Sequence, residues 1–412
     1  MEFTKVGLEE RDPRYTHMDD ESKSPAALLI PSASSEGGSP PSKGAPADPA
    51  HSATDATYAA CGYASMDGAS PLQPLAYQIR AEADEVVVQV ECCGVCGSDV
   101  HMISNDWPGL EYPLVAGHEL VGTVVSAGAS APASLAIGTR VGIGHISRTC
   151  GTCRYCLAGN DEICEHIVAT AAGPRHAGGF GSHVVAQAKH VFPIPAALPS
   201  EQAAPLLCGG ITVYSPLLAY DVRPGDRVGI IGMGGLGHLA VQFAKAWGCH
   251  VTVFSTSAAK EAEARALGAH AFVVSSDAAA MAACVDTLDF IYYLVPYDID
   301  WELYMSILRR NGTLCVMAGA PSPMTIRTTS LFLPNNHKRI VGRNIGPAAW
   351  HLRMLEFAAL HGVRAVVESF PLGEVNEVVE RVRTNAVRFR AVLTHEGQFT
   401  DDVIKAGATP RV

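Results

Sequence analysis

Four closely spaced cysteines carry the strongest chemical signal in this chain. They follow the spacing C-x2-C-x2-C-x7-C, and glycines at 151 and 159 allow tight turns between them. Four thiolates this close suit tetrahedral zinc, which binds sulfur at about 2.3 Å. Iron–sulfur clusters also use four cysteines, but at other usual spacings; four independent buried cysteines or local disulfides are further alternatives. The favoured interpretation is a closed, structural zinc site made by Cys150, Cys153, Cys156 and Cys164.

A second group of possible metal ligands is spread along the sequence. Cys96 stands in ECCGVCGSDVHMI, His118 and Glu119 stand in YPLVAGHELVG, and Cys208 stands in APLLCGGITVYSPL. Two cysteines and one histidine would leave zinc an open position, which a catalytic zinc needs. The spacing alone does not reveal such a site, because either cysteine by itself is more often a buried core thiol than a ligand.

The segment GMGGLG at 232–237 matches the pattern G-x-G-x-x-G between a predicted strand and a predicted helix. In that context the glycines let backbone amides approach a pyrophosphate at a helix N-terminus. A plain glycine-rich turn is the alternative, since the pattern is weak when it stands alone. The residues predicted to bind the cofactor here are Gly232, Gly234, Gly235 and Gly237.

The residues after the second strand of this region indicate which nucleotide is bound. In NAD-binding folds an acidic residue about 20 residues past the turn accepts hydrogen bonds from the ribose 2′-hydroxyl. No acidic residue lies between Gly248 and Lys260, where Ser255, Thr256 and Ser257 stand instead. Three hydroxyls and one ammonium suit the 2′-phosphate of NADP(H). Ser257 could also cap a helix, and the two roles are compatible.

Two kinds of element must position these groups. The β-branched runs Glu85–Glu91 and Leu120–Val125 read as strands of a β-rich barrel. From about residue 225, strands and helices alternate, which predicts a parallel α/β sheet. The predicted strands are Arg227–Ile231, His250–Phe254, Phe290–Val295 and Thr313–Ala318, and the predicted helices are His238–Trp247 and roughly Ala258–Leu267. The chain shows no internal repeat.

Composition narrows the possible partners and location. The net charge of the 412 residues is 30 − 41 = −11, without a basic block, so neither nucleic acid nor an anionic membrane is an expected partner. No apolar run approaches the ~20 residues of a membrane-spanning helix, and the acidic N-terminus lacks a signal-type core. A cytoplasmic protein is therefore expected, in which clustered cysteines more often bind metal than form disulfides.

The first 56 residues differ from the rest in composition. In the stretch 24–50, 21 of 27 residues are Pro, Ser, Gly or Ala, and residues 1–56 carry −5 of the −11 net charge. Such a segment cannot bury enough apolar surface to offset its ordering entropy. We therefore predict a disordered N-terminal extension over 1–56.

Together these motifs resemble those of zinc-dependent medium-chain alcohol dehydrogenases. The resemblance rests on GHE-x-x-G, CGVCGSD-x-H, the four cysteines and CGGITVYSPL, and it extends from about residue 57 to about 397. APLLCGGITVYSPL, GMGGLGHLAVQFAKAWG and STS-x-x-K resemble the cinnamyl-alcohol-dehydrogenase branch in particular. The family implies an α/β plus β-barrel protein, with a GroES-like catalytic domain at 57–208, a Rossmann domain at 209–345 and a return to the catalytic domain over 346–412. It also implies a homodimer.

The resemblance assigns roles to individual residues. Cys96, His118 and Cys208 would hold the catalytic zinc, and Glu119 would be a neighbouring carboxylate that can also bind it. Ser98 would hydrogen-bond the alcohol oxygen, His101 would pass the proton to solvent, Asp99 would orient His118, and Trp107, also plausible as a core residue, would flank the substrate pocket. Further cofactor contacts are implied for Thr212, Leu236, Gly319, Arg343 and Ile345.

The chain departs from the pattern of that branch at four residues, which lie in three places. Tyr293-Leu294 stands where relatives usually have Asp-Thr, and Gly342-Arg343 stands where they have Gly-Ser. Gly97 replaces a frequent histidine or arginine beside the pyrophosphate.

The implied reaction is hydride transfer between NADP(H) and a primary alcohol or aldehyde, aliphatic or aromatic, with two zinc ions per subunit. Three alternatives remain at this stage. One is an NAD-dependent, zinc-containing polyol dehydrogenase, another is a zinc- and nucleotide-binding protein that has lost turnover, and the third is a zinc-free quinone or enone reductase. The NADP-type loop disfavours the first, and the complete ligand set disfavours the other two.

Overall fold

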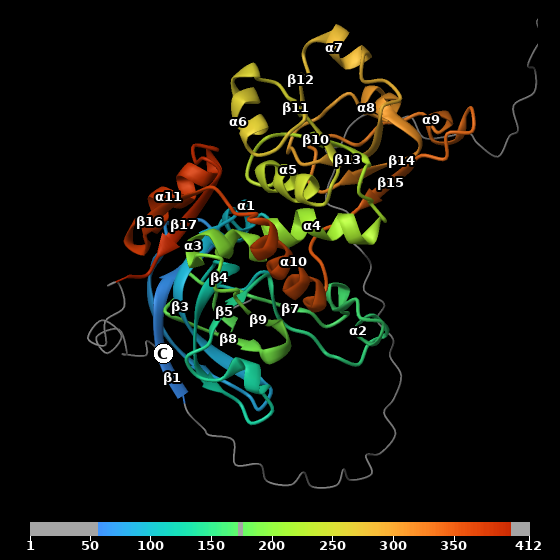
Figure 1. Ribbon diagram of the computed structural model, residues 1–412. Helices are drawn as coiled ribbons and strands as arrows, with labels where there is room; N and C mark the ends of the chain where they lie inside the picture. The colour runs from blue at the N-terminus through green and yellow to red at the C-terminus, as the bar shows by residue number, and fades with distance from the viewer. Residues whose placement is uncertain (1–56, 172–175, 397–412) are drawn as a thin grey trace, which may run out of the picture. The chain divides into compact units, whose positions relative to one another are not determined.

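The computed structural model describes residues 57–171 and 176–396 (Figure 1). The predicted extension over 1–56 lies outside the described residues, as do the last residues of the predicted C-terminal segment, 397–412. Among the described residues, no helix is both long and apolar enough to cross a membrane.

The first part of the fold is built mainly from antiparallel strands, with one parallel pair formed by β16 and β17. A hairpin of β1 (Thr57–Ala64) and β2 (Gln73–Arg80) precedes a seven-stranded sheet with the order β16-β17-β3-β4-β5-β9, in which β8 also pairs with β3. The bounds of the sheet's strands are β3 Glu85–Val95, β4 Glu119–Ala127, β5 Arg140–Ile143, β8 His183–Gln187, β9 Val191–Pro193, β16 Val367–Pro371 and β17 Arg390–Thr394. A separate pair is formed by β6 (Ile146–Arg148) and β7 (Val168–Ala169). The predicted strands Glu85–Glu91 and Leu120–Val125 lie within β3 and β4.

The second part is the predicted parallel sheet. Its six strands have the order β12-β11-β10-β13-β14-β15, and every neighbouring pair is parallel. Figure 1 shows these strands in yellow and orange with their connecting helices around them. The strand bounds are β10 Arg227–Ile231, β11 His250–Ser255, β12 Ala271–Val274, β13 Leu288–Tyr293, β14 Leu308–Val316 and β15 Arg339–Gly342, and the helices are α5 Gly237–Ala246, α6 Glu261–Ala266, α7 Ala278–Ala282, α8 Trp301–Ile307 and α9 Thr329–Phe332. A six-stranded parallel sheet beside a separate, mainly antiparallel one is the arrangement expected of the predicted α/β plus β-barrel class.

The remaining helices lie around the antiparallel sheet and its junction with the parallel one. Their bounds are α1 Gly97–Ile103, α2 Arg154–Leu157, α3 Ser200–Ala203, α4 Gly209–Ala219, α10 Ala348–His361 and α11 Val375–Arg383. Short 3-10 turns are η1 Ala133–Leu135, η2 Asp161–Ile163, η4 Ala188–His190, η5 Ala204–Leu207, η6 Ala258–Lys260 and η7 Leu372–Glu374. Helix α4 packs on α5 through buried aromatic rings, with Tyr214 and Phe243 centroids 5.3 Å apart. This packing holds α4, and with it the N-cap residue Cys208, against the parallel-sheet part of the fold.

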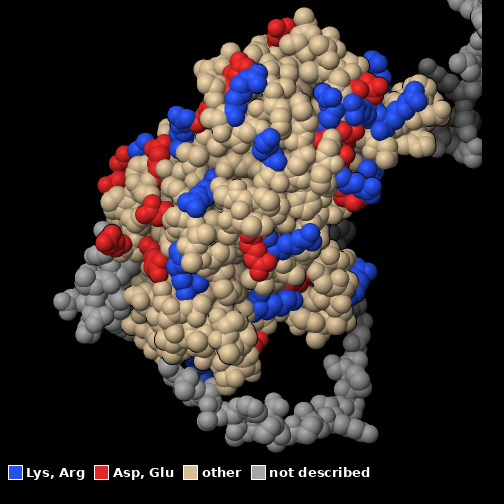
Figure 2. Space-filling view, in the orientation of Figure 1, with Lys and Arg blue, Asp and Glu red and all other residues tan. Residues whose placement is uncertain are grey.

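Charge on the visible surface is mixed. Figure 2 shows Lys and Arg interspersed with Asp and Glu over the described residues of the face in view. That face therefore presents no broad field of one sign.

Candidate active site

The pairing of β3 with β4 brings the first two metal-ligand candidates together. In this antiparallel pair Gly94 lies opposite Glu119, so the end of β3 meets the start of β4. Cys96 follows β3 as the N-cap of α1, and His118 immediately precedes β4. A Cβ at Gly94 would lie 2.1 Å from the Glu119 carboxylate, so any larger residue there would displace that carboxylate.

The third ligand candidate, Cys208, lies 90 positions after His118 in the sequence. Cys208 ends the turn η5 and caps α4. Its Sγ lies 3.3 Å from Nε2 of His118, and one ligand atom from each of Cys96, His118, Glu119 and Cys208 lies within 4.8 Å of the others. Two thiols, an imidazole and a carboxylate at these separations are a donor set suited to zinc.

Asp99 accepts hydrogen bonds from the side chain of His118 and from the main chain beside both ligand candidates. Its Oδ1 accepts from Nδ1 of His118 at 2.7 Å and from the backbone N–H of Gly117 at 3.0 Å, while Oδ2 accepts from the backbone N–H of Cys96 at 2.9 Å. Because Nδ1 of His118 is engaged, Nε2 is the nitrogen left to bind a metal. Asp99 is fully buried, which keeps this arrangement from solvent.

A substitution at Asp99 should weaken the metal site. In Asp99→Asn an amide N–H₂ would face at least one of three N–H donors, so we expect metal affinity or turnover to fall by roughly 10–100-fold. The measurement is zinc retention against a competing chelator, together with the turnover number. Asp67→Asn is the control, because Asp67 also accepts main-chain N–H bonds but lies in an exposed loop. Unchanged zinc retention and turnover in Asp99→Asn would contradict the assigned role.

Sequence reasoning missed Arg390, which reaches this set from β17. Its guanidinium donates to the buried carboxylate of Glu119 across 271 positions in sequence. Burial raises the pKa of Glu119 to about 7, and the positive charge of Arg390 opposes that rise. Oε2 of Glu119 has no hydrogen-bond partner in the described part of the chain, so this oxygen is available to bind a cation. No local pattern could have revealed Arg390, because the contact depends on strand pairing.

His145 is a second residue that the sequence did not signal. Its ring meets that of His118 edge to face, with centroids 5.6 Å apart. Burial, followed by the nearby His118, lowers the pKa of His145 to about 4. The imidazole is therefore neutral at physiological pH and lies beside the ligand set.

The predicted proton-relay residues share α1. Ser98 and His101 are three positions apart and so lie on one side of the helix. Nδ1 of His101 hydrogen-bonds Oδ2 of Asp106 at 2.8 Å, and its ring stacks on Trp107 at 5.5 Å. Trp107 is 38% exposed, so it lies at the surface beside His101 and not in the core.

The four-cysteine set forms a separate lobe. The lobe runs from Cys150 through α2 and η2 to Cys164, and one ligand atom from each cysteine lies within 4.8 Å of the others. All twelve cysteines of the chain are described, and none of them forms a disulfide in this structure. Main-chain N–H groups of Thr152 and Cys153 lower the pKa of Cys150 to about 6, which favours the thiolate that zinc requires. Gly151 and Gly159 have φ of 72° and 78°, the left-handed region in which glycine is favoured.

The glycine-rich turn lies between β10 and α5, as predicted for a nucleotide site. Gly232 has φ of 98°, and a Cβ at Gly237 would lie 2.0 Å from the Gly232 carbonyl oxygen. A Cβ at Gly234 would meet no atom within 4 Å, so that backbone borders open space. The turn therefore offers room for a pyrophosphate beside the start of α5, where Leu236 is the N-cap.

The serine-rich loop closes on this turn. Nζ of Lys260 donates to the carbonyl oxygen of Met233 at 3.2 Å, which places the ammonium next to the glycines. Ser255 ends β11 with its hydroxyl on the main chain of Ser257, while Thr256 is exposed. Ser257 also caps η6 by accepting from the N–H of Ala259, as its second predicted role requires.

The other predicted cofactor residues are more dispersed. Thr212 lies in α4, one turn after Cys208, whose carbonyl oxygen accepts its N–H at 2.9 Å. Gly319 follows β14 and borders open space, and Ile345 is buried between β15 and α10. Arg343 directs its guanidinium to Glu162 of the four-cysteine lobe at 2.9 Å. Its place in the cofactor site stays a prediction.

The unusual Tyr293-Leu294 pair has a packing role. Tyr293 is buried against Trp301 with centroids 4.7 Å apart, and its hydroxyl donates to the carbonyl oxygen of Tyr297 at 2.6 Å. The N–H of Leu294 donates to Ile231 at 3.2 Å. These contacts complete the end of β13 next to the glycine turn.

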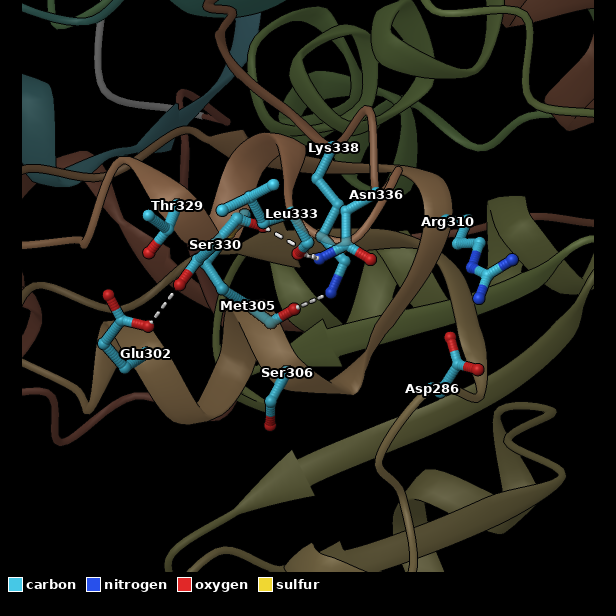
Figure 3. Close-up of a pocket in the computed structure, with 10 residues that line it drawn as sticks. All are labelled: Asp286, Glu302, Met305, Ser306, Arg310, Thr329, Ser330, Leu333, Asn336 and Lys338. Carbon is cyan, nitrogen blue, oxygen red and sulfur yellow. Dashed lines mark hydrogen bonds between the residues drawn. The ribbon is translucent and has the colours of Figure 1, made fainter. Parts of the chain in front are cut away.

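A pocket in the parallel-sheet part is distinct from these sites. Figure 3 shows its polar side chains, among them Ser330 donating to Glu302 at 2.7 Å and Lys338 donating to the carbonyl oxygen of Met305 at 2.7 Å. Its cavity volume is about 400 Å³, and none of its lining residues belongs to a cysteine set or to the glycine turn.

Comparison with known proteins decides the family. An alcohol dehydrogenase GroES-like domain matches residues 82–196, and a zinc-binding dehydrogenase domain matches residues 235–386. The chain is 38% identical over 334 residues to aldehyde reductase AdhA of Synechocystis sp., covering 81% of this chain and 98% of that protein. The chain belongs to the zinc-dependent medium-chain alcohol dehydrogenase family. The resemblance predicted from the motifs is thus confirmed, and with it the oxidoreductase class.

Other relatives place it near the cinnamyl alcohol dehydrogenases. A probable cinnamyl alcohol dehydrogenase of Zea mays is 41% identical over 345 residues, covering 82% of this chain and 93% of that protein. The solved cinnamyl alcohol dehydrogenase of Sorghum bicolor aligns with a TM-score of 0.77 and 37% identity, over 82% of this chain and 98% of that one. The Helicobacter pylori enzyme, solved as a complex with NADP(H), aligns with a TM-score of 0.75 and 26% identity, over 84% and 100%.

Proposed function

We propose that this protein transfers a hydride between NADP(H) and a primary alcohol or aldehyde, aliphatic or aromatic, at a zinc ion. The observation that carries the proposal is that the open ligand set and the glycine turn are neighbours. A Cβ at Gly209, next to Cys208, would lie 3.5 Å from Leu236 of the turn. Arg390, which contacts Glu119, would lie 3.2 Å from a Cβ at Gly235. Metal and nucleotide would therefore meet at one place.

The ligand assignment follows from this placement. Cys96, His118 and Cys208 would hold the catalytic zinc, and Glu119, whose carboxylate is paired with Arg390, would be the alternative ligand. A zinc ion in this set supplies Lewis acidity to the substrate oxygen, and NADP(H) supplies or accepts the hydride. Cys150, Cys153, Cys156 and Cys164 would hold a second, structural zinc, giving two ions per subunit.

The chain's own residues would manage the proton. Ser98 would hydrogen-bond the alcohol oxygen and pass its proton to His101 on the same side of α1. Because Asp106 accepts from Nδ1 of His101, the other ring nitrogen is left to take the proton and release it to solvent. His101 is exposed, which suits an exit from a buried ligand set.

The proposal also covers the residues that contact the cofactor, the domain bounds, the oligomeric state and the location. The turn glycines, Leu236, Thr212, Gly319 and the main chain near Ile345 would border the cofactor, with Ser255, Thr256, Ser257 and Lys260 on the 2′-phosphate. We also infer a catalytic domain over 57–208 and 346–412 with a nucleotide-binding domain over 209–345 between its two segments. We also propose a homodimer, as the family resemblance implies, and a cytoplasmic location.

The proposal is tested by an NADPH oxidation assay on a panel of aliphatic, benzylic and cinnamyl aldehydes. We expect reduction of several aldehydes, loss of activity after zinc is stripped, and recovery when zinc is restored. Activity that persists without zinc would favour an enone reductase. Polyol oxidation with NAD in preference to NADP would favour a polyol dehydrogenase, and zinc-loaded, folded protein without turnover would favour a binding protein.

A further inference from the structure

The segment Gly342–Ala348 joins the edge strand β15 to α10 and is held by both parts of the fold. At the C-cap of α4, the hydroxyl of Tyr220 donates to the carbonyl oxygen of Gly342 at 2.8 Å. From β14, the carbonyl oxygen of Val316 accepts the N–H of Arg343 at 3.3 Å. The segment is thus fixed on the side of the parallel sheet.

The four-cysteine lobe holds the same segment from the other side. Glu162 lies in η2, between Cys156 and Cys164, and its Oε1 lies 2.9 Å from Nη2 of Arg343. The side chains are 5% and 20% exposed, so little water screens the pair. The Arg343 guanidinium also lies over the ring of Trp350, 5.0 Å from its centroid.

A second acidic residue of the lobe reaches the far end of the segment. Oδ1 of Asp161 accepts the N–H of Ala348, the first residue of α10, at 3.1 Å. Its Oδ2 lies 2.9 Å from Nζ of Lys189, which balances the buried charge. Neighbouring residues of one turn therefore contact both ends of the segment, and Figure 1 shows the lobe, marked by α2, on the side where α10 lies.

We propose that Glu162 is a positioning residue for cofactor binding: through Arg343 it holds the Gly342–Ile345 main chain in the place that receives NADP(H). The inference rests on the proposed function, in which this segment borders the cofactor. Because the guanidinium is committed to Glu162, Arg343 acts through the position of its main chain and not by touching the cofactor. The four-cysteine lobe then contributes to cofactor affinity as well as to folding.

The contribution of the lobe to cofactor affinity can be separated from its contribution to folding by replacing each member of the Glu162–Arg343 pair in turn. The Arg343 side chain lies outside the cysteine cluster, so replacing it leaves the metal ligands and their main chain intact. Glu162 lies two residues before Cys164, so its replacement must be checked for zinc content. Agreement between the two replacements isolates the pair from the metal.

The experiment compares Glu162→Gln, Arg343→Gln and the double variant, each loaded with zinc and without substrate. The readout is the dissociation constant of NADPH from its fluorescence, with zinc per subunit and melting temperature measured alongside. We expect either single replacement to raise the dissociation constant roughly 5- to 20-fold, within the usual range for coupled sites. The NADPH dissociation constant of the double variant should not exceed that of the weaker-binding single variant, because each single replacement already removes the same contact.

Two controls distinguish positioning from general destabilisation. Arg343→Lys keeps a positive charge for Glu162 but loses the guanidinium plane over Trp350, so its NADPH dissociation constant should lie between those of the unchanged protein and Arg343→Gln. Glu380→Gln removes an exposed pair, Arg383 Nε to Glu380 at 3.1 Å, and should leave the dissociation constant unchanged. In steady state the KM for NADPH should rise in the two single variants while kcat stays within about twofold.

Three outcomes would overturn the inference. One is an unchanged NADPH dissociation constant in Arg343→Gln, with only the melting temperature lowered. Another is full additivity of the two replacements, which would show that they act independently. If the unchanged, zinc-loaded protein fails to bind NADPH, the proposed function falls and this inference with it.

Discussion

Replacing His118 with alanine should abolish aldehyde reduction while leaving a folded protein. The imidazole is 1% exposed and is the one nitrogen donor in its cluster with Cys96, Glu119 and Cys208. Its loss would remove metal polarisation of the substrate oxygen, which is worth several kcal/mol. At a factor of ten for each 1.36 kcal/mol, kcat/KM should fall by at least about 10³-fold.

The fold should survive this change because the partner of His118 keeps another donor. Oδ1 of Asp99 would still accept the N–H of Gly117 at 3.0 Å, so the buried carboxylate is not left unpaired. Circular dichroism and metal analysis should show native secondary structure and about one zinc per subunit instead of two, the remaining ion being that of the four-cysteine set. His361→Ala, on the exposed face at the end of α10, is the matched control and should keep full activity. An active His118→Ala protein would refute the ligand assignment.

Cys153→Ser provides the opposite contrast. Helix α2 of the four-cysteine lobe contributes no buried residue, so zinc held in the lobe would contribute folding free energy directly. Soluble yield and melting temperature should fall, while the zinc-loaded fraction that remains folded keeps its kcat. Separate effects of His118→Ala on turnover and of Cys153→Ser on stability would establish unequal roles for the two sets.

The parts that sequence predicted best are those whose determinants are local. The four cysteines lie within fifteen residues, so their spacing was enough to indicate one site. The strand Arg227–Ile231 has the bounds that were predicted, because a short apolar run stands between a charged residue and a glycine. The glycine turn that follows was recognisable for the same reason.

Strands with irregular sequence were placed less well. Strand β14 was predicted to begin at Thr313 but begins at Leu308, since Arg309, Arg310 and Asn311 read as a loop. Asn311 has φ of 63°, and the pairing of β13 with β14 shifts register between Leu288 and Phe290. A polar turn is thus part of an otherwise regular strand. A prediction that looks for runs of apolar residues does not detect such a turn.

The helix predicted over Ala258–Leu267 is instead a 3-10 turn followed by a short helix. The break falls at Lys260, whose side chain reaches back to the carbonyl oxygen of Met233. Helical periodicity in the sequence could not anticipate a contact that depends on the fold of the glycine turn. The same limit applies to Arg390 and Glu162, whose partners are set by strand pairing and by the docking of the lobe.

A double replacement in the serine-rich loop should reverse or erase the preference for NADP(H). Lys260 places its ammonium 3.2 Å from the carbonyl oxygen of Met233, so a positive charge lies between the end of β11 and the glycine turn. In a dinucleotide-binding fold this is where the adenosine ribose and its 2′ group lie. Ser255, at the end of β11, is the position at which a carboxylate would accept the 2′-hydroxyl of NAD.

The expected size of the effect follows from the charges. Charge-assisted hydrogen bonds are worth roughly 1.5–3 kcal/mol each, so two contacts to a phosphate favour NADP(H) by an order of magnitude or more. Lys260→Ala removes the cation, and Ser255→Asp adds a negative charge that repels the phosphate. The single variants should each reduce the ratio of kcat/KM for NADPH over NADH, and the double variant should bring it to unity or below.

The measurement is that ratio with one aldehyde, taken at two salt concentrations because a charge preference weakens as ionic strength rises. Lys245→Ala is the control: this lysine lies on α5 with its Nζ 3.0 Å from His270, away from the serine loop. Its removal should leave the ratio unchanged, which shows that position and not net charge decides the preference. A ratio near unity in the unchanged protein would mean that Lys260 serves only to tie its loop to the glycine turn. The absence of a carboxylate after β11 would then be insufficient to select NADP(H), and an NAD-dependent polyol dehydrogenase would become the better assignment.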